Sequence, residues 1–351
     1  KFKNSKVVNR MDYMFNNCYN LISINLSNFY TSLTNNFSYM FYDCTNLSSL
    51  DFPNLDISNS IDSNDKIFKT CYNLQYLILS NLKANKNDLS YLFRDLINLI
   101  SIDLTNFNGS SINNTMEGMF YNCKKLQSLY LPNLDFSFTT NINDIFKGCY
   151  SLTSIVLSNF TTSYISNFSN MFYDCNLTIL DLSNFVGSKV INRMDNMFNN
   201  CQNIISIDLP NLDLTYTTNI SYMFNGCSSL KSITIVNLKY SPISNYSYMF
   251  NNCTSLENVD LSKFITTKIP NSMDYMFNNC NNLKRLDFSN LDLTYTINPN
   301  TIFFSLNNLE YLILKDLKAF NTSDFSYMFK DLTNLISIDL TNFNGSSINN
   351  T

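Results

Sequence analysis

Met14-Phe15-Asn16-Asn17-Cys18 is a phrase that returns throughout the chain and decides its fold. Self-similarity at a fixed period of about 20 to 50 residues is typical of a solenoid, in which each repeat forms one coil stacked on the one before. We therefore expect one solenoid of about 13 coils of about 26 residues. The phenylalanine of the phrase recurs at intervals of 25, 26 or 27 residues, at Phe15, Phe41, Phe68, Phe93, Phe120, Phe146, Phe172, Phe198, Phe224, Phe250, Phe277, Phe303 and Phe329.

The residues that follow the phrase have the pattern of a short strand. Leu21, Ile24 and Leu26 come after Cys18, and Asn25 makes a polar break between the last two. Such alternation with a period of two predicts a half-buried strand. Coils stacked in register would align these strands into one parallel sheet on one face of the solenoid.

The phrase itself has a different periodicity. Met14, Phe15 and Cys18 lie 3, 4 and 7 residues after Met11, which places all four on one helical face. We therefore expect a short helix in each coil, packed on the side opposite the sheet. Together the two halves predict an α/β solenoid.

The combined frame resembles that of the BspA-like leucine-rich repeat surface proteins. It consists of L-x-x-L-x-L, the added phrase M-F-x-x-C-x-x-L and a trailing L-S-N-F, and it covers the whole chain. Leu96, Leu306 and Leu332 depart from it by replacing the cysteine. The resemblance implies a leucine-rich-repeat horseshoe or superhelix. It also implies an extracellular or cell-surface protein used in adhesion, matrix attachment or surface coating.

The composition argues against an enzyme and against nucleic-acid binding. The chain has no histidine, so it lacks the commonest general base and metal ligand, and we expect no cofactor. Its net charge is −4 with 14% charged residues, which leaves no basic field for phosphates. No apolar run approaches the roughly 18 residues of a membrane span. We therefore expect no span in this segment.

The cysteines form a single column. Neighbour pairing into disulfides always leaves a thiol over, because Leu96 divides the column into runs of three and seven. We predict buried, free, structural thiols, with a redox or metal role as the alternative. The column consists of Cys18, Cys44, Cys71, Cys123, Cys149, Cys175, Cys201, Cys227, Cys253 and Cys280.

A second column carries aspartates at the exposed strand position. It is a candidate binding face for Ca²⁺ or a basic ligand, and the alternative is a solvated sheet face. Ile78, Tyr130, Val156, Thr234 and Ile313 interrupt it. Its members are Asp51, Asp103, Asp181, Asp208, Asp260, Asp287 and Asp339.

Asn-x-Ser/Thr sequons are numerous. In a chain so rich in Asn and Ser, many arise by chance, but those in loops are possible N-glycosylation sites if the protein is secreted by a eukaryote. They include Asn36, Asn108, Asn113, Asn167, Asn219, Asn245 and Asn321.

Residues 276–351 reproduce residues 40–115 almost in order, and neither end carries a polar cap. We expect residues 1–351 to be a single uncapped solenoid and a segment of a longer array. The leading hypothesis is a non-enzymatic structural or adhesive protein that forms a scaffold, coat or fibre. The alternative is a receptor-like module whose concave sheet face recognises a partner. The expected partners are a protein or glycan at a cell surface, or other copies joined end to end or laterally.

Overall fold

The structure is a computed structural model. It divides into two compact units, Lys1–Ile165 with Asn170–Asn184, and Ser166–Ser169 with Phe185–Thr351. Both units are stretches of parallel β-solenoid with one strand per turn of about 26 residues. The described residues are 9–61, 64–84, 88–107, 115–131, 139–156, 164–178, 180, 182, 191–209, 214–235, 242–261, 270–319 and 325–344.

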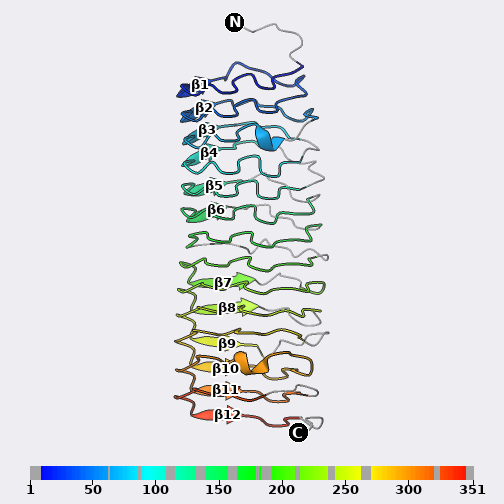
Figure 1. The fold of residues 1–351 in the computed structure, drawn as a ribbon, viewed down its shortest axis with the longest axis vertical. Coiled ribbons are helices and arrows are strands. Elements are labelled where there is room, and N and C mark those ends of the chain that lie inside the picture. The colour runs from blue at the N-terminus through cyan, green and yellow to red at the C-terminus, as the bar shows by residue number, and fades with distance from the viewer. Residues whose placement is uncertain are drawn as a thin grey trace. The chain divides into compact units, whose positions relative to one another are not determined.

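The described residues of the first unit contain six short strands. They form a four-stranded parallel sheet in the order β1-β2-β3-β4 and a two-stranded parallel sheet, β5-β6 (Figure 1). Equivalent residues pair from turn to turn, so Ile24 lies opposite Leu50, and Leu50 opposite Leu77. The strands are β1 (Ser23–Asn25), β2 (Ser49–Asp51), β3 (Tyr76–Ile78), β4 (Ser101–Asp103), β5 (Ser128–Tyr130) and β6 (Ser154–Val156).

The second unit has the same plan. Its strands form a two-stranded parallel sheet, β7-β8, and a four-stranded parallel sheet in the order β9-β10-β11-β12. The strands are β7 (Ser206–Leu209), β8 (Ser232–Ile235), β9 (Asn258–Asp260), β10 (Arg285–Asp287), β11 (Tyr311–Ile313) and β12 (Ser337–Asp339). The described residues thus contain twelve strands. The expected total of about thirteen coils stays a prediction.

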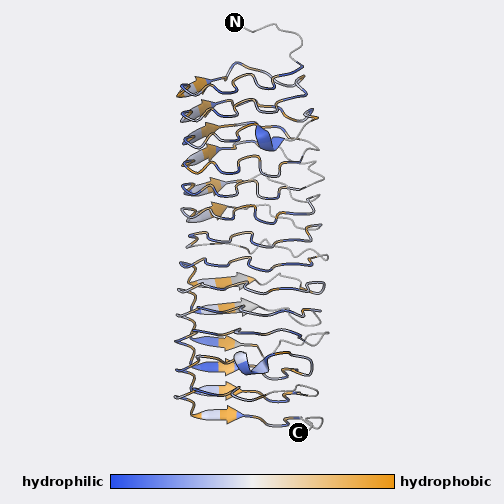
Figure 2. Ribbon diagram, viewed as in Figure 1, coloured by the Kyte–Doolittle hydropathy of each residue, from blue (hydrophilic) through white to orange (hydrophobic). Residues whose placement is uncertain are grey.

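The core of each unit is a set of apolar columns. Figure 2 shows apolar residues along the strands. Leu50 and Leu77 are buried beneath the first sheet and Leu286 and Leu312 beneath the last. The repeated phenylalanines stack with near-parallel rings, 5.2–5.9 Å between centroids in the first unit and 5.4–5.9 Å in the second. Stacked rings at this distance add attraction beyond the area they bury.

The phrase around each phenylalanine forms turns, so the expectation of short helices on that side is wrong for the described repeats. In the turn from Met194 to Cys201, Asn196 has φ 58° and Asn200 has φ 62°. A right-handed helix cannot contain residues in the left-handed region. The apolar spacing still serves burial, because Met194 and Cys201 are both fully buried.

This turn geometry lets the backbone join neighbouring turns. The N–H groups of Asn196 and Phe198 donate to carbonyls of the next turn, at 2.9 Å each. The N–H groups of Met197, Asn199 and Cys201 instead donate locally, to carbonyls three residues back, at 3.0–3.3 Å. In a helix the N–H groups beyond the first turn would bond within the helix, so those of Phe198 and Asn200 would not be available to the next coil.

Isolated bridges extend the pairing to other sides of the coil. In the second unit one series runs Asn167, Arg193, Asn219, Asn245 and Ser272, and another runs Asp292, Lys318 and Asn344.

The helices among the described residues are two 3₁₀ turns, η1 (Asn64–Lys66) and η2 (Pro299–Thr301). They occupy matching places in the two duplicated blocks. No helix in the described part of the chain has the length and apolar character of a membrane span.

Candidate functional site: side-chain columns and the sheet face

The cysteines lie in a column that bonds one turn to the next. All ten are free, and all but Cys18 are buried. The Sγ of Cys149 donates to the carbonyl oxygen of Phe120, one turn earlier, and the Sγ of Cys227 donates likewise to Phe198, both at 3.2 Å. The same contact, at 3.0–3.2 Å, recurs for Cys44, Cys71, Cys123, Cys175, Cys253 and Cys280.

Burial controls the chemistry of these thiols. Desolvation raises the pKa of Cys149 and Cys227 to about 12, partly offset by the hydrogen bond each makes to backbone. A thiol with so high a pKa is a poor nucleophile and a poor metal ligand at neutral pH. The described residues contain no group of three or more Cys, Asp or Glu placed to hold a metal ion.

The aspartate column is used mainly to end the strands. Asp103 accepts the backbone N–H and the hydroxyl of Thr105 at 2.9 and 2.6 Å. Asp339 binds Thr341 in the same way, at 3.0 and 2.6 Å. This hydrogen bonding lowers the pKa of Asp339, with a smaller effect from Lys315. These carboxylates therefore close the turn that follows each strand.

The carboxylates do not form a continuous row. In the paired registers, Ile78 lies between Asp51 and Asp103, and Ile313 lies between Asp287 and Asp339. Asp51 accepts Nδ2 of Asn25 from the preceding turn at 2.8 Å, and Asp287 bonds Ser289 as the others bond threonine. Asp181 lies outside the described residues, as do the side chains of Asp208 and Asp260.

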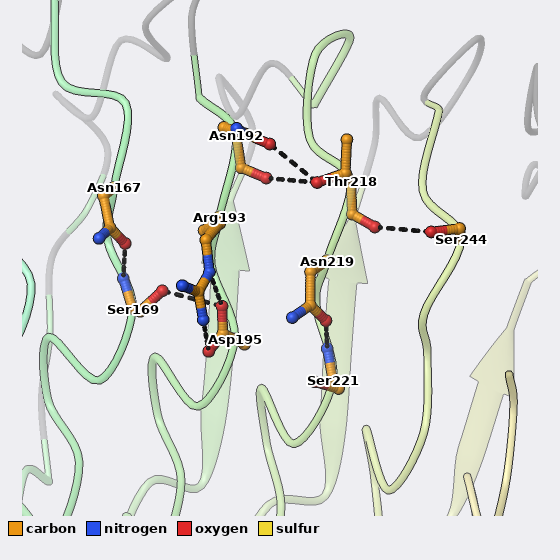
Figure 3. A network of polar contacts seen from close by, with 9 residues as sticks. All are labelled: Asn167, Ser169, Asn192, Arg193, Asp195, Thr218, Asn219, Ser221 and Ser244. Carbon is orange, nitrogen blue, oxygen red and sulfur yellow. Dashed lines mark hydrogen bonds and ion pairs between the residues drawn. The ribbon is translucent and has the colours of Figure 1, made fainter.

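Four sequon asparagines are engaged in turns. The Oδ1 of Asn167 accepts the backbone N–H of Ser169, and that of Asn219 accepts Ser221, each at 3.0 Å (Figure 3). Asn36 and Asn245 make the same bond to Ser38 and Ser247, at 2.9 and 3.0 Å. Asn-x-Ser is therefore an Asx-turn motif here, which accounts for its recurrence at this place in the coil. Asn108, Asn113 and Asn321 lie outside the described residues.

Arg193 takes the asparagine's place in one turn of this column. Its guanidinium binds Asp195 through two hydrogen bonds of 2.9 Å (Figure 3). Asp195 also accepts the hydroxyl of Ser169 from the preceding turn at 2.8 Å. The ion pair thus performs the local closure that an Asx turn performs elsewhere.

Asparagine amides form further ladders between turns. Asn225 donates to Asn199, Asn251 to Asn225, and Asn278 to Asn251, at 2.6–2.8 Å. Each amide has donors and an acceptor, so a stacked column can bond in one direction throughout. The Asn-rich composition of the chain is therefore used in turn-to-turn bonding.

The sheet face of the first unit carries exposed apolar side chains, of which Ile78, Tyr130 and Val156 were expected only as interruptions of the aspartate column. Tyr76 and Ile78 on β3 are 49% and 40% exposed, and Tyr130 on β5 is 61% exposed. Val156, which pairs with Tyr130 in register, is 46% exposed. The alternation with a period of two could have revealed this exposure from the sequence, because a residue that replaces an outward-facing Asp in a strand must itself face outward.

Comparison with solved structures finds leucine-rich-repeat proteins. The chain is similar to a leucine-rich repeat protein from Bacteroides ovatus, with 16% identity, 95% of this chain and 85% of that chain covered, and a TM-score of 0.49. It is also similar to a leucine rich cell surface protein from Faecalibacterium prausnitzii, with 16% identity, 95% and 75% covered, and a TM-score of 0.40.

No curated protein matches the sequence. One family profile does, and its matches over residues 1–82, 87–206, 192–313 and 271–351 account for nearly the whole chain. The chain therefore belongs to the family described as Mycoplasma protein of unknown function, DUF285.

Proposed function

We propose that the chain is a non-enzymatic structural or adhesive repeat protein that forms an extended scaffold, coat or fibre. The observation that carries the proposal is the backbone bonding of the Met194–Cys201 turn, where alternate N–H groups donate to the next turn. Together with the sheets and the isolated bridges, it ties successive described turns within a unit on more than one side of the coil. Such regular coupling suits a protein whose task is to hold distance and shape.

The polar side chains support the same role. The cysteine, aspartate and asparagine columns direct their hydrogen bonds to neighbouring turns or to their own turn. The polar groups of these side chains thus stabilise the stacked turns. The proposed location, at the cell surface or outside the cell, follows from the resemblance of the repeats to BspA-like surface repeats.

Two measurements test the scaffold. Negative-stain microscopy of the protein purified from the cells that express it should show long particles or fibres, and intact cells should lose the protein to added trypsin. A protein that appears only as dispersed short particles, or that trypsin reaches only after lysis, would contradict the proposal.

A receptor-like binding module is the second candidate, and the apolar residues on the first unit's sheet face favour it. Exposed aromatic and β-branched side chains of this kind often mark a protein contact. Adhesion of host cells or matrix proteins to surfaces coated with the chain would then fall at least tenfold in Tyr130→Ser/Val156→Ser. A pure scaffold predicts no change in adhesion.

A further inference from the structure

A polar groove lies on the second unit at the start of strands β9 to β12. Its volume is about 840 Å³. Glu257, Lys284, Glu310 and Ile336 line it, each from the position that precedes or begins a strand region. Asn282, Asn308 and Asn334 form a second row along it. None of these residues belongs to the cysteine column, the aspartate column or the sequon asparagines.

The backbone fixes the spacing of the first row. The N–H of Lys284 donates to the carbonyl of Glu257 at 3.1 Å, that of Glu310 to Lys284 at 2.9 Å, and that of Ile336 to Glu310 at 2.9 Å. The four side chains therefore follow one another at the strand separation of about 4.8 Å. The first row therefore offers one side chain per turn, and the side chain is charged in three of the four turns.

The asparagine row presents acceptors. Nδ2 of Asn334 donates to the carbonyl of Asn307 at 2.8 Å and to Oδ1 of Asn308 at 3.1 Å. Nδ2 of Asn308 donates to the carbonyl of Asn281 at 2.5 Å. With the amide nitrogens of Asn308 and Asn334 turned toward the protein, Oδ1 of Asn334 and the second acceptor site on Oδ1 of Asn308 are left to meet a ligand.

The charged residues add donors and acceptors without a strong field. Nζ of Lys284 lies 3.9 Å from Oε1 of Glu310, beyond hydrogen-bonding distance, and the two side chains are 66% and 34% exposed. A hydroxyl group placed between them could accept from the ammonium and donate to the carboxylate. The lining contains two carboxylates and one ammonium, so its net charge is negative and it disfavours a phosphate-rich ligand.

A peptide fits the groove poorly. Addition of a strand needs free backbone groups, yet the N–H groups of Lys284, Glu310 and Ile336 already bond the neighbouring turn. Side-chain anchoring needs apolar pockets, and Ile336 is the single aliphatic residue among those that line the groove. A neutral ligand with many hydroxyl groups matches the lining, because each hydroxyl group can accept a hydrogen bond from the ammonium and donate one to a carboxylate or amide oxygen.

We propose that this groove binds a neutral glycan chain, whose successive rings lie along successive turns. The role goes beyond the scaffold and does not depend on it, because a glycan could bind this groove in an isolated chain as well as in a fibre. Glu310 and Lys284 hold hydroxyl groups, and the asparagine oxygens accept from the neighbouring ones.

The chain's own duplication supplies a matched variant. In the copied block, Ser48 stands where the second unit has Lys284, and Gln75 stands where it has Glu310. The same kind of turn therefore accommodates both replacements. Lys284→Ser/Glu310→Gln removes the groove's central charges with residues that the fold already uses at these places.

Isothermal titration of the full chain with cellohexaose, chitohexaose and maltohexaose tests the proposal. We expect at least one of these neutral hexasaccharides to bind, and Lys284→Ser/Glu310→Gln to weaken that binding at least tenfold with an unchanged melting temperature. Lys315→Ser is the control. It also adopts the copy's residue, Ser80, but lies beyond β11 and outside the groove lining, so its binding should match that of the unaltered chain.

Three results would overturn the proposal. The first is that none of the three hexasaccharides binds. The second is that Lys284→Ser/Glu310→Gln binds as well as the unaltered chain. The third is that binding of a peptide, and of no glycan, depends on these two residues. Loss of the fibre in microscopy would leave the titration unaffected, so failure of the scaffold and failure of the groove are distinguishable.

Discussion

At the residue scale, Cys149 shows why cysteine recurs where leucine is also accepted. It fills an apolar place in the core and its thiol bonds the Phe120 carbonyl of the preceding turn. Leu96 fills the same place in its own turn and is fully buried, but it has no donor to offer. Cysteine thus combines packing with a weak hydrogen bond at one position.

The buried thiols should make stability depend on alkaline pH. Burial raises the folded pKa of Cys149 and Cys227 to about 12, whereas an unfolded thiol ionises near pH 8.5. The folded state therefore retains protons that the unfolded state loses. The stabilisation is complete below about pH 8.5 and is lost progressively as the pH rises toward 12, by up to about 1.4 kcal/mol per thiol and pH unit.

Urea unfolding at pH 7.5 and pH 10 checks this prediction. Cys149→Leu/Cys227→Leu should lose less stability between the two pH values than the unaltered chain, by up to about 4 kcal/mol for two thiols over 1.5 units above pH 8.5. Tyrosines ionise in both proteins and cancel from the comparison. Equal pH dependence of the two proteins would mean that these thiols titrate normally in the folded state.

At the element scale, strands were predictable from the sequence and the turns opposite them were not. The strand expected around Ile24 is β1, and the equivalent residues of other repeats, Leu50, Ile102 and Val259, lie in β2, β4 and β9. Alternation has a period that only an extended segment satisfies. Spacings of 3, 4 and 7, by contrast, also arise when left-handed residues turn the chain every fourth position.

The signal that separates a helix from these turns lies two residues after each phenylalanine. Asn17, Asp43, Gly148 and Gly226 occupy that place, and all have positive φ. Asn, Asp and Gly are the residues that enter this region most readily. The candidate groove was not singled out in the same way, because its position in the coil changes residue type from Glu257 to Lys284 to Ile336 and so forms no column of one residue.

Substitution of Gly226, at φ 74°, distinguishes a turn from a helix. In a helix, Gly→Ala would stabilise the protein by about 0.5–1 kcal/mol. In the left-handed turn, Gly226→Ala should destabilise it by about 1 kcal/mol.

Gly226→Asn is the matched control. It should be tolerated within about 0.5 kcal/mol, because Asn200 and Asn252 hold φ 62° and 60° in the adjacent turns. Thermal unfolding of the two variants reports the sign. A more stable Gly226→Ala would contradict the turn geometry.

At the scale of the whole molecule, the turn is the unit that can be added or removed. Asn219 and Asn245 occupy equivalent places and pair as a parallel bridge, so the chain before one can continue into the chain after the other. Each turn contacts its neighbours, and its removal leaves two surfaces that match. The duplicated block is consistent with such modular growth.

Deletion of residues 220–245 should therefore preserve a cooperative fold, with a smaller urea m-value because less surface is exposed on unfolding. Deletion of residues 220–232 removes half a coil, so the strand of one coil would lie beside the loop of the next. It should lower the free energy of unfolding by more than about 4 kcal/mol. Circular dichroism with urea titration compares the two. Equal damage from both deletions would show that the 26-residue period does not govern the stack.

The hydrogen bonds between turns also determine how each unit responds to tension. A pull along the stacking direction loads the bonds of one turn at a time, because the N–H groups of residues such as Asn196 and Phe198 point toward the adjacent turn. Each detached turn lengthens the chain by up to about 90 Å, at roughly 3.5 Å per extended residue. A surface anchored through such a protein would have a tether that yields in steps and absorbs shear before it breaks.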